Sequence, residues 1–530
     1  MPASSETPLV SSQPEPSLYL HRPRRPHCRA GGFLVNVAEA ESLPSPGESI
    51  EEKLREFLLR DLPYLVSKTD FTKKNPARKL LQQCSESGLN SPQTSLARQI
   101  ELDMLAGGVL DPDFWLSHAA GPAWLLSRFG DDQQRDRWEK SLEFAQKIGL
   151  VCPQNELIAD DKGKGLQLSG KIPQLPYGNL ADLLIAFPEI DGKCSALILP
   201  VNSRSAHFSR EADCRTTVAL KSVKITADQF LGNPGEGRGI LRSLNLWRQF
   251  RRTAMLLGKL RLETNRQRLL FPDPQSAEAR RSPREYRQFR HGMNLLPILI
   301  RLLHHQGRNL QDFRWTGSGE PASGKLEILE NAFLQWHICD LLGINPSSSP
   351  IFPREKRGPG RHLSDEMRLF NSFIRAVLLE EFPLRHALEA FHFENPATET
   401  DSGDPLLNFI EVARRETCLL LKQGLTLFGK DLPYQPLWQP VLFDSMRYLY
   451  LLSGALLVFE DEDPGEVRHQ NRYAIHHWGD RLFRANREGK RLLQDPSKNG
   501  ENPDPLRKRW EELERQFPGS SLTSSGPSHD

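Results

Sequence analysis

The spacing of apolar residues divides the chain into helical and strand-forming regions. Between residues 49 and 148 apolar side chains recur every three or four positions, which is the period of an amphipathic helix. From 149 to 236 the apolar runs shorten to strand length and alternate with turn residues, and from 237 to 495 helical spacing returns. The pattern predicts a mainly α protein in which a small central β domain separates an N-terminal from a C-terminal helical domain.

Individual segments show these periods clearly. In the β region, ADLLIAFPEIDGKCSALILPV places two apolar runs on either side of Asp191-Gly192, which is a hairpin signal, and TTVALKSVKI adds another strand. After Gly239 a long helix carries one apolar stripe that consists of Ile240, Leu244, Trp247, Phe250, Ala254 and Leu257. A similar stripe at the start of the first helical region consists of Leu54, Phe57, Leu58 and Leu62.

Composition narrows the class of protein. The 530 residues are 38% hydrophobic and 26% charged, so the chain is long enough for two or three domains with substantial cores. Residues 1–48 and 496–530 are rich in Pro and Ser and are predicted to be disordered tails. A formal charge of +2 gives no overall field that recruits nucleic acid. The longest apolar runs are too short to cross a bilayer and no signal peptide is visible, so we expect a cytoplasmic protein without a membrane span.

Neither cysteine nor histidine shows the spacing of a metal site. The seven cysteines contain no C-x-x-C pair, which fits reduced thiols in a cytosolic chain. The pairs His304-His305 and His476-His477 are adjacent in sequence, whereas helical zinc ligands are separated by four positions. We therefore expect no metal site.

The stretch SVKITADQFLGNPGEGRG, residues 222–239, joins a strand to a helix through four glycines. Neither the dinucleotide spacing G-x-G-x-x-G nor a phosphate loop ending in Gly-Lys-Ser/Thr is present. The glycines are expected instead to let the chain turn sharply out of the β domain, at positions where φ is positive.

Three stretches, in chain order, resemble sequence motifs of the acyl-CoA dehydrogenase family. HAAGPAWLLSRFGDDQQRDRW is similar to a helical stretch of that family, and SGKIPQLPYGNLADLLIAF to a strand motif. FLGNPGEGRG and then LWRQFRRTAMLLGKL are similar to the turn and the long helix that follow. The resemblance implies a helical domain, a small β-barrel and a C-terminal helical bundle, assembled as a homodimer or homotetramer.

The resemblance also implies a reaction. In that family a glutamate removes the α-proton of an acyl thioester while the β-hydride passes to bound FAD, a step of fatty acid metabolism. One family position for the glutamate directly precedes an Arg on the long helix, where this chain has Trp247 before Arg248. The other lies in a Tyr-Glu-Gly-Thr loop. Phe459-Glu460 is its nearest match, so Glu460 is the candidate catalytic base.

The family's FAD contacts are only partly matched. VCPQNE replaces the Leu-Thr-Glu-Pro strand whose hydroxyl holds the flavin, and Gln174, Leu175 and Pro176 replace Trp-Ile-Thr. Proline lacks the N–H donor that a flavin ring would use. The segment ETNRQRLLF resembles the family motif Arg-x-x-Phe-Gly. In the family this Arg reaches the cofactor pyrophosphate of a neighbouring subunit, so the resemblance implies that Arg266 binds FAD.

Three hypotheses stay open from the sequence. The first is an FAD-dependent oxidoreductase that acts on an acyl thioester. The second is a catalytically silent homologue that uses the same scaffold as a binding or assembly subunit, because both base positions are altered. The third is an unrelated helical interaction protein, which an absence of β-structure between Gly165 and Ile225 would support.

Overall fold

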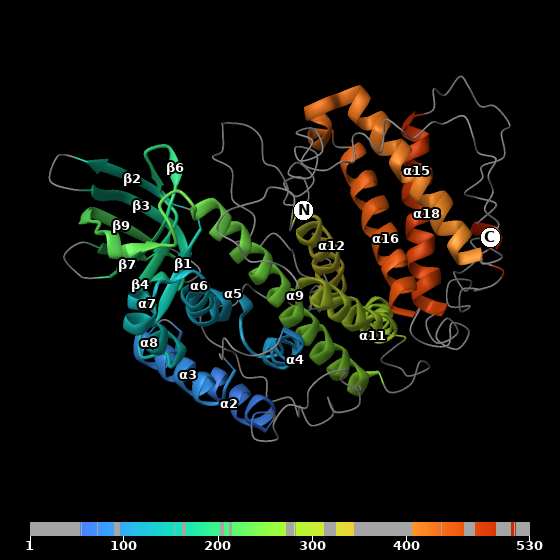
Figure 1. Cartoon of the computed structure of the whole chain (residues 1–530). Coiled ribbons are helices and arrows are strands. Elements are labelled where there is room, and N and C mark those ends of the chain that lie inside the picture. The colour runs from blue at the N-terminus through green and yellow to red at the C-terminus, as the bar shows by residue number, and fades with distance from the viewer. Residues whose placement is uncertain are drawn as a thin grey trace, which may run out of the picture.

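The computed structural model describes residues 54–343 with short gaps, of which 272–279 and 312–324 are the longest, and then 405–435, 437–459, 472–493 and a few residues from 510 to 515. Apart from those few residues, both predicted tails lie outside this part of the chain. Figure 1 shows two sheets at one end, blue N-terminal helices packed against them, and a long helix that runs toward the C-terminal helices.

The N-terminal part is helical, as the apolar spacing predicts. Its elements are η2 (Phe57–Asp61), α2 (Leu62–Lys68), α3 (Lys74–Glu86), α4 (Leu96–Gly107), α5 (Pro112–Trp115), η3 (Leu116–Ala120), α6 (Gly121–Phe129), α7 (Asp132–Gln134), η4 (Arg135–Glu139) and α8 (Lys140–Glu143). Leu54, Leu58 and Leu62, which share the first predicted stripe, are all buried. Phe114 and Trp115 are fully buried and supply much of the volume of this core.

Two mixed sheets occupy the middle of the chain. The four-stranded sheet has the order β1 (Gly149–Cys152), β4 (Leu183–Ala186), β7 (Ala196–Pro200), β10 (Phe230–Leu231). The six-stranded sheet has the order β6 (Lys193–Cys194), β5 (Glu189–Ile190), β2 (Glu156–Asp161), β3 (Leu166–Pro176), β9 (Arg215–Lys224), β8 (Ala206–Arg210). The predicted β-structure between Gly165 and Ile225 is therefore present, which removes the support for an unrelated all-helical protein.

The predicted small β-barrel is not confirmed as a closed barrel, because the two sheets do not close in the described part of the chain. Each sheet ends in two edge strands and the two sheets share no strand, whereas a barrel has no edges. The reason lies in the four-stranded sheet, whose strands are buried on both faces. Leu184 and Ala186 pack against the six-stranded sheet, whereas Leu183 and Ile185, one position out of phase, pack against the helices. A sheet covered on both faces forms the middle layer of a stack.

Turn chemistry follows the sequence closely in the hairpin and in the glycine-rich loop. Asp191 (φ 50°) and Gly192 (φ 73°) join β5 to β6, as a two-residue hairpin turn requires. In the glycine-rich loop, Gly232 (φ 68°) and Gly235 (φ 90°) are left-handed as expected. Gly237 serves a different purpose, because a Cβ there would lie 2.6 Å from the backbone carbon of Ser195.

Helix α9 (Gly237–Leu270) connects the sheets to the rest of the molecule (Figure 1). It crosses α4 at a point where both backbones touch. A Cβ on Gly258 would lie 1.7 Å from the carbonyl oxygen of Met104, and one on Gly107 would lie 2.2 Å from that of Met255. The later glycine of the family-like helix motif is thus explained by helix packing rather than by chemistry.

The C-terminal part is helical, as predicted. Its further elements are α11 (Pro283–Gln311), α12 (Lys325–Leu342), α15 (Pro405–Phe428), η8 (Gly429–Tyr434), α16 (Trp438–Phe459) and α18 (Arg472–Leu493). A buried chain of hydrogen bonds links four helices. Thr253 donates to Asn331 (2.7 Å), Asn331 donates to Gln306 (2.9 Å), and Gln306 donates to the hydroxyl of Tyr450. Such a chain fixes the register of α9, α12, α11 and α16 relative to one another.

Candidate functional site

The candidate site is the junction where α9, the N-terminal helices and the four-stranded sheet meet. One continuous apolar cluster spans all three parts. It contains Trp115 and Leu125 from the helices, Ile185 and Ile198 from the sheet, and Trp247 from α9. A cofactor cleft at this junction would have to interrupt that cluster.

Three arginines of α9 point into the molecule. Arg248, Arg251 and Arg252 are only 3–5% exposed, although they lie outside the apolar stripe predicted for this helix. The residues that directly precede them are Trp247, Phe250 and Arg251. Whichever arginine matches the family motif, therefore, no carboxylate stands in the position of a catalytic base.

Arg251 forms a buried ion pair with Asp103 of α4. Its Nε and Nη2 both donate to the carboxylate at 2.6 Å, and Gln99 adds a third donor at 3.3 Å. Burial raises the pKa of Asp103, while Arg251 and Gln99 act in the opposite direction. Two short charge-assisted bonds favour the ionised carboxylate, so the pair is a salt bridge that ties α4 to α9.

The Trp247 indole is enclosed on both sides. It stacks on Trp124 of α6 with ring centroids 4.9 Å apart and an interplanar angle of 18°, and the Arg251 guanidinium lies 4.8 Å from its centroid. Trp247 is 7% exposed. The residue at the first family position for the base is thus part of a packed stack of rings that holds α6 against α9.

Polar groups near β1 are also engaged. Arg248 donates to the hydroxyl of Ser117 (2.9 Å). The imidazole of His118 lies 3.1 Å from the carbonyl of Phe114 and 3.2 Å from that of Tyr177. Burial, more than any other influence, lowers the pKa of His118 to about 4, and the positive charge of Arg248 adds to this effect. His118 is therefore neutral at pH 7, when it can donate to only one of the two carbonyls.

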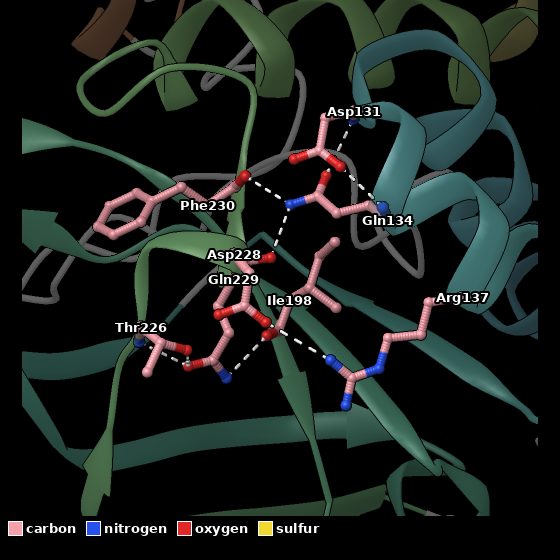
Figure 2. A network of polar contacts seen from close by, with 8 residues as sticks. All are labelled: Asp131, Gln134, Arg137, Ile198, Thr226, Asp228, Gln229 and Phe230. Carbon is pink, nitrogen blue, oxygen red and sulfur yellow. Dashed lines mark hydrogen bonds and ion pairs between the residues drawn. The ribbon is translucent and has the colours of Figure 1, made fainter.

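A second set of contacts fixes the segment that leads into the glycine-rich loop (Figure 2). Asp131 and Gln134 form a capping box at the start of α7, and the Gln134 side-chain nitrogen donates to the carbonyls of Asp228 (2.9 Å) and Phe230 (2.7 Å). Gln229 makes the same two kinds of contact. It completes a capping box with Thr226 and donates to the Ile198 carbonyl (3.2 Å). The acidic and Gln residues of the family-like helical stretch thus clamp the helical part to the strands.

Of the two residues predicted for chemistry, the structure describes one. Arg266 lies on α9, is 41% exposed, and approaches Glu263 at 3.8 Å. Glu460 follows the last residue of α16 and lies outside the described residues. The roles of both remain predictions.

The residues at the matched cofactor positions do not fit FAD. Cys152 replaces the hydroxyl residue, is fully buried, and directs its thiol toward the carbonyl of Leu150 in its own strand (3.6 Å). Burial raises the pKa of this thiol, so it stays protonated. Leu175 lies in the core between the sheets. The first motif therefore offers a buried thiol in place of a hydroxyl group, and in the second Pro176, which follows Leu175, takes the place of the Thr.

Within the described ranges, no group of three or more His, Cys, Asp or Glu side chains is arranged to hold a metal ion. None of the described helices combines the length and the apolar character that a membrane span requires.

Comparison with solved structures identifies the fold. The acyl-CoA dehydrogenase of Bacillus anthracis complexed with FAD matches 91% of this chain and 94% of its own, with a TM-score of 0.64 at 14% sequence identity. Butyryl-CoA dehydrogenase from Megasphaera elsdenii matches 57% of this chain and 92% of its own (TM-score 0.43, 14% identity). Glutaryl-CoA dehydrogenase from Mycobacterium smegmatis in complex with FADH2 matches 56% and 85% (TM-score 0.43, 15% identity). No family model and no curated protein matches the sequence.

This chain therefore has the acyl-CoA dehydrogenase fold, and the resemblance seen in its sequence is confirmed as a likeness of fold. The Bacillus anthracis match leaves only 9% of this chain uncovered, about 48 of its 530 residues. Helices α15, α16 and α18 have 24, 22 and 22 residues, so the match must include part of them. At least part of the long C-terminal region thus belongs to the shared fold.

Proposed function

We propose that this protein is a catalytically silent acyl-CoA dehydrogenase homologue that serves as a binding or assembly subunit. The observation that carries the proposal is the filled junction. Trp247 and Phe250 stand before arginines of α9, and the stack of Trp124, Trp247 and Arg251 lies in the middle of this junction. An α-proton can be removed only by a base within hydrogen-bond reach of it, and these side chains provide none.

The altered FAD contacts support the same proposal. Cys152 and Pro176 stand where the family resemblance places flavin-binding hydroxyl groups, and neither side chain carries a hydroxyl. Cys152 and Leu175, the residue before Pro176, are buried in the core between the sheets. A flavin ring at these positions would displace buried side chains, and losing the packing of one large buried side chain costs about 2–5 kcal/mol. The scaffold would then persist because it presents surfaces to other molecules rather than because it oxidises a substrate.

The test is an activity measurement on the full chain supplied with FAD. The protein is mixed with a series of acyl-CoA thioesters and an electron-accepting dye, and dye reduction is followed by absorbance. The proposal expects no rate above that of free FAD, together with stable association with a partner on purification. Thioester-dependent dye reduction that follows the protein through purification would overturn it.

The alternative is an FAD-dependent dehydrogenase acting on an acyl thioester in a homodimer or homotetramer. It is supported by the fold and by Arg266, which is exposed enough to reach the cofactor of a second subunit. Glu460 would then have to serve as the base. Replacing Glu460 with Gln distinguishes the alternatives, because activity that this substitution abolishes is the signature of the dehydrogenase.

A further inference from the structure

A group of basic and aromatic side chains lies between α11 and α18, outside the junction described above. Figure 1 shows α11 at one end of α18, and residues of the two helices touch there. The ring centroids of His291 on α11 and His477 on α18 are 4.6 Å apart, and the hydroxyl of Tyr473 is hydrogen-bonded to Nδ1 of His291. Tyr473 also stacks in parallel with His477, at 6.1 Å and 4°.

Each helix adds arginines one turn from its histidine. Arg287 precedes His291 by four residues and Arg481 follows His477 by four, so each Arg lies on the same helix face as its neighbouring His. Arg290 acts electrostatically on Tyr473. We call the set the α11–α18 basic cluster, which consists of Arg287, Arg290, His291, Tyr473, His477 and Arg481.

Among the described residues, the positive charge of the cluster has no carboxylate of its own. Within the described part of the chain, Arg290 and Arg481 form no ion pair, and Arg287 donates only to the backbone carbonyl of Pro283 (3.3 Å). Arg481 does act on Asp444, but that carboxylate is bound to Arg447 at 2.8 Å. Three guanidinium groups therefore act on one region in which the described residues supply no dedicated anion.

Burial and the positive charge of the arginines lower the pKa of both histidines. Burial lowers the pKa of His291, and Arg481, Arg287 and Arg290 lower it further. Burial, His291 and Arg481 lower the pKa of His477 to about 3. Both rings are therefore neutral at pH 7. They supply polar atoms without adding to the repulsion among the arginines.

We propose that the α11–α18 basic cluster binds the phosphoryl group of a ligand. Arginine matches the geometry of phosphate oxygens and forms charge-assisted hydrogen bonds with them. The Tyr473 hydroxyl and the imidazole nitrogens are further polar groups beside the bound oxygens. Arg287 and Arg481 are exposed, so the site is open to solvent. The inference does not rest on the proposed function, because none of these residues belongs to the α9 junction.

The experiment uses the full chain and two kinds of phosphoryl probe. Inorganic phosphate and pyrophosphate are titrated by calorimetry at low ionic strength, and vesicles of phosphatidylcholine with and without phosphatidate are tested by co-sedimentation. The Arg290→Gln/Arg481→Gln variant is expected to weaken binding at least about tenfold. The control is Arg484→Gln/Arg491→Gln, which removes the same charge from α18 at 72% and 81% exposed side chains.

The control variant is expected to bind as the unaltered chain does, within about twofold. In an NMR pH titration, the imidazole signals of His291 and His477 should titrate at a higher pH in the presence of phosphate, because a bound anion raises the pKa of both rings. Binding to phosphatidate vesicles but not to free phosphate would support the site with a lipid headgroup as its source. An absence of binding to every probe would overturn the proposal, as would equal losses in the two variants.

Discussion

The buried ion pair between Asp103 and Arg251 yields the sharpest prediction. Replacing Asp103 with Asn removes the charge that compensates the guanidinium, which is only 4% exposed. The change also breaks two bonds of 2.6 Å. The guanidinium cannot reach water without leaving Trp247, on which it stacks. We expect the free energy of unfolding to fall by about 3–5 kcal/mol, the usual cost of orphaning one member of a buried pair.

A double variant separates this cost from the net contribution of the ion pair to the free energy of unfolding. Asp103→Leu with Arg251→Met fills the same space with apolar side chains and leaves no buried charge. We expect it to be more stable than Asp103→Asn alone by about 2 kcal/mol or more, because the desolvation cost of both charges is removed. Chemical denaturation of the unaltered chain, the single variants Asp103→Leu and Arg251→Met, and the double variant gives the coupling energy. If the double variant loses as much as the two singles combined, the pair is not coupled and the reasoning fails.

Three further predictions test the packing and the junction. Gly258→Ala should lower stability by about 1–3 kcal/mol, measured by thermal denaturation, because its Cβ would strike a backbone carbonyl 1.7 Å away. Gly108→Ala should leave stability unchanged, because its Cβ would make only ordinary van der Waals contacts. Equal losses of stability in the two variants would contradict the close crossing of α4 and α9. Gln134→Glu should cost about 2 kcal/mol in urea unfolding, because a carboxylate cannot donate to the backbone carbonyls of Asp228 and Phe230. Gln229→Glu loses one such bond and should cost less. The pKa of His118 is near 6.5 in the unfolded chain and about 4 in the folded protein. The stability that the neutral His118 contributes to the fold is therefore complete above pH 6.5 and is lost as the pH falls to 4. The loss should reach about 3 kcal/mol, and a His118→Gln chain that shows the same pH slope would refute it.

The order of helical, β and helical regions could be predicted from the sequence because local periodicity determines it. The hairpin at Asp191-Gly192 and the left-handed turns at Gly232 and Gly235 followed from turn chemistry alone. The closure of the sheets could not be predicted in this way. Continuous apolar runs such as LLIAF show that a strand is buried on both faces, but not which neighbour covers each face.

The polar side chains of the junction were missed for a related reason. Arg248, Arg251 and Arg252 lie off the apolar stripe, so periodicity assigns them to solvent, whereas α9 is surrounded by other elements. The acidic partner of Arg251 is 148 residues away in sequence. The one available signal was that Glu101 and Asp103 stand among the apolar residues of α4, and it identifies no partner. Side-chain pairs that form only where two helices cross cannot be predicted from the local sequence pattern.

The central claim is that the α9 junction is closed by the chain's own side chains. The most direct test is the absorption spectrum of the purified full chain in the near ultraviolet and blue, before and after incubation with excess FAD and removal of the unbound cofactor. The account predicts a colourless protein that retains no flavin. A yellow preparation with stoichiometric FAD would contradict it and would favour the dehydrogenase alternative.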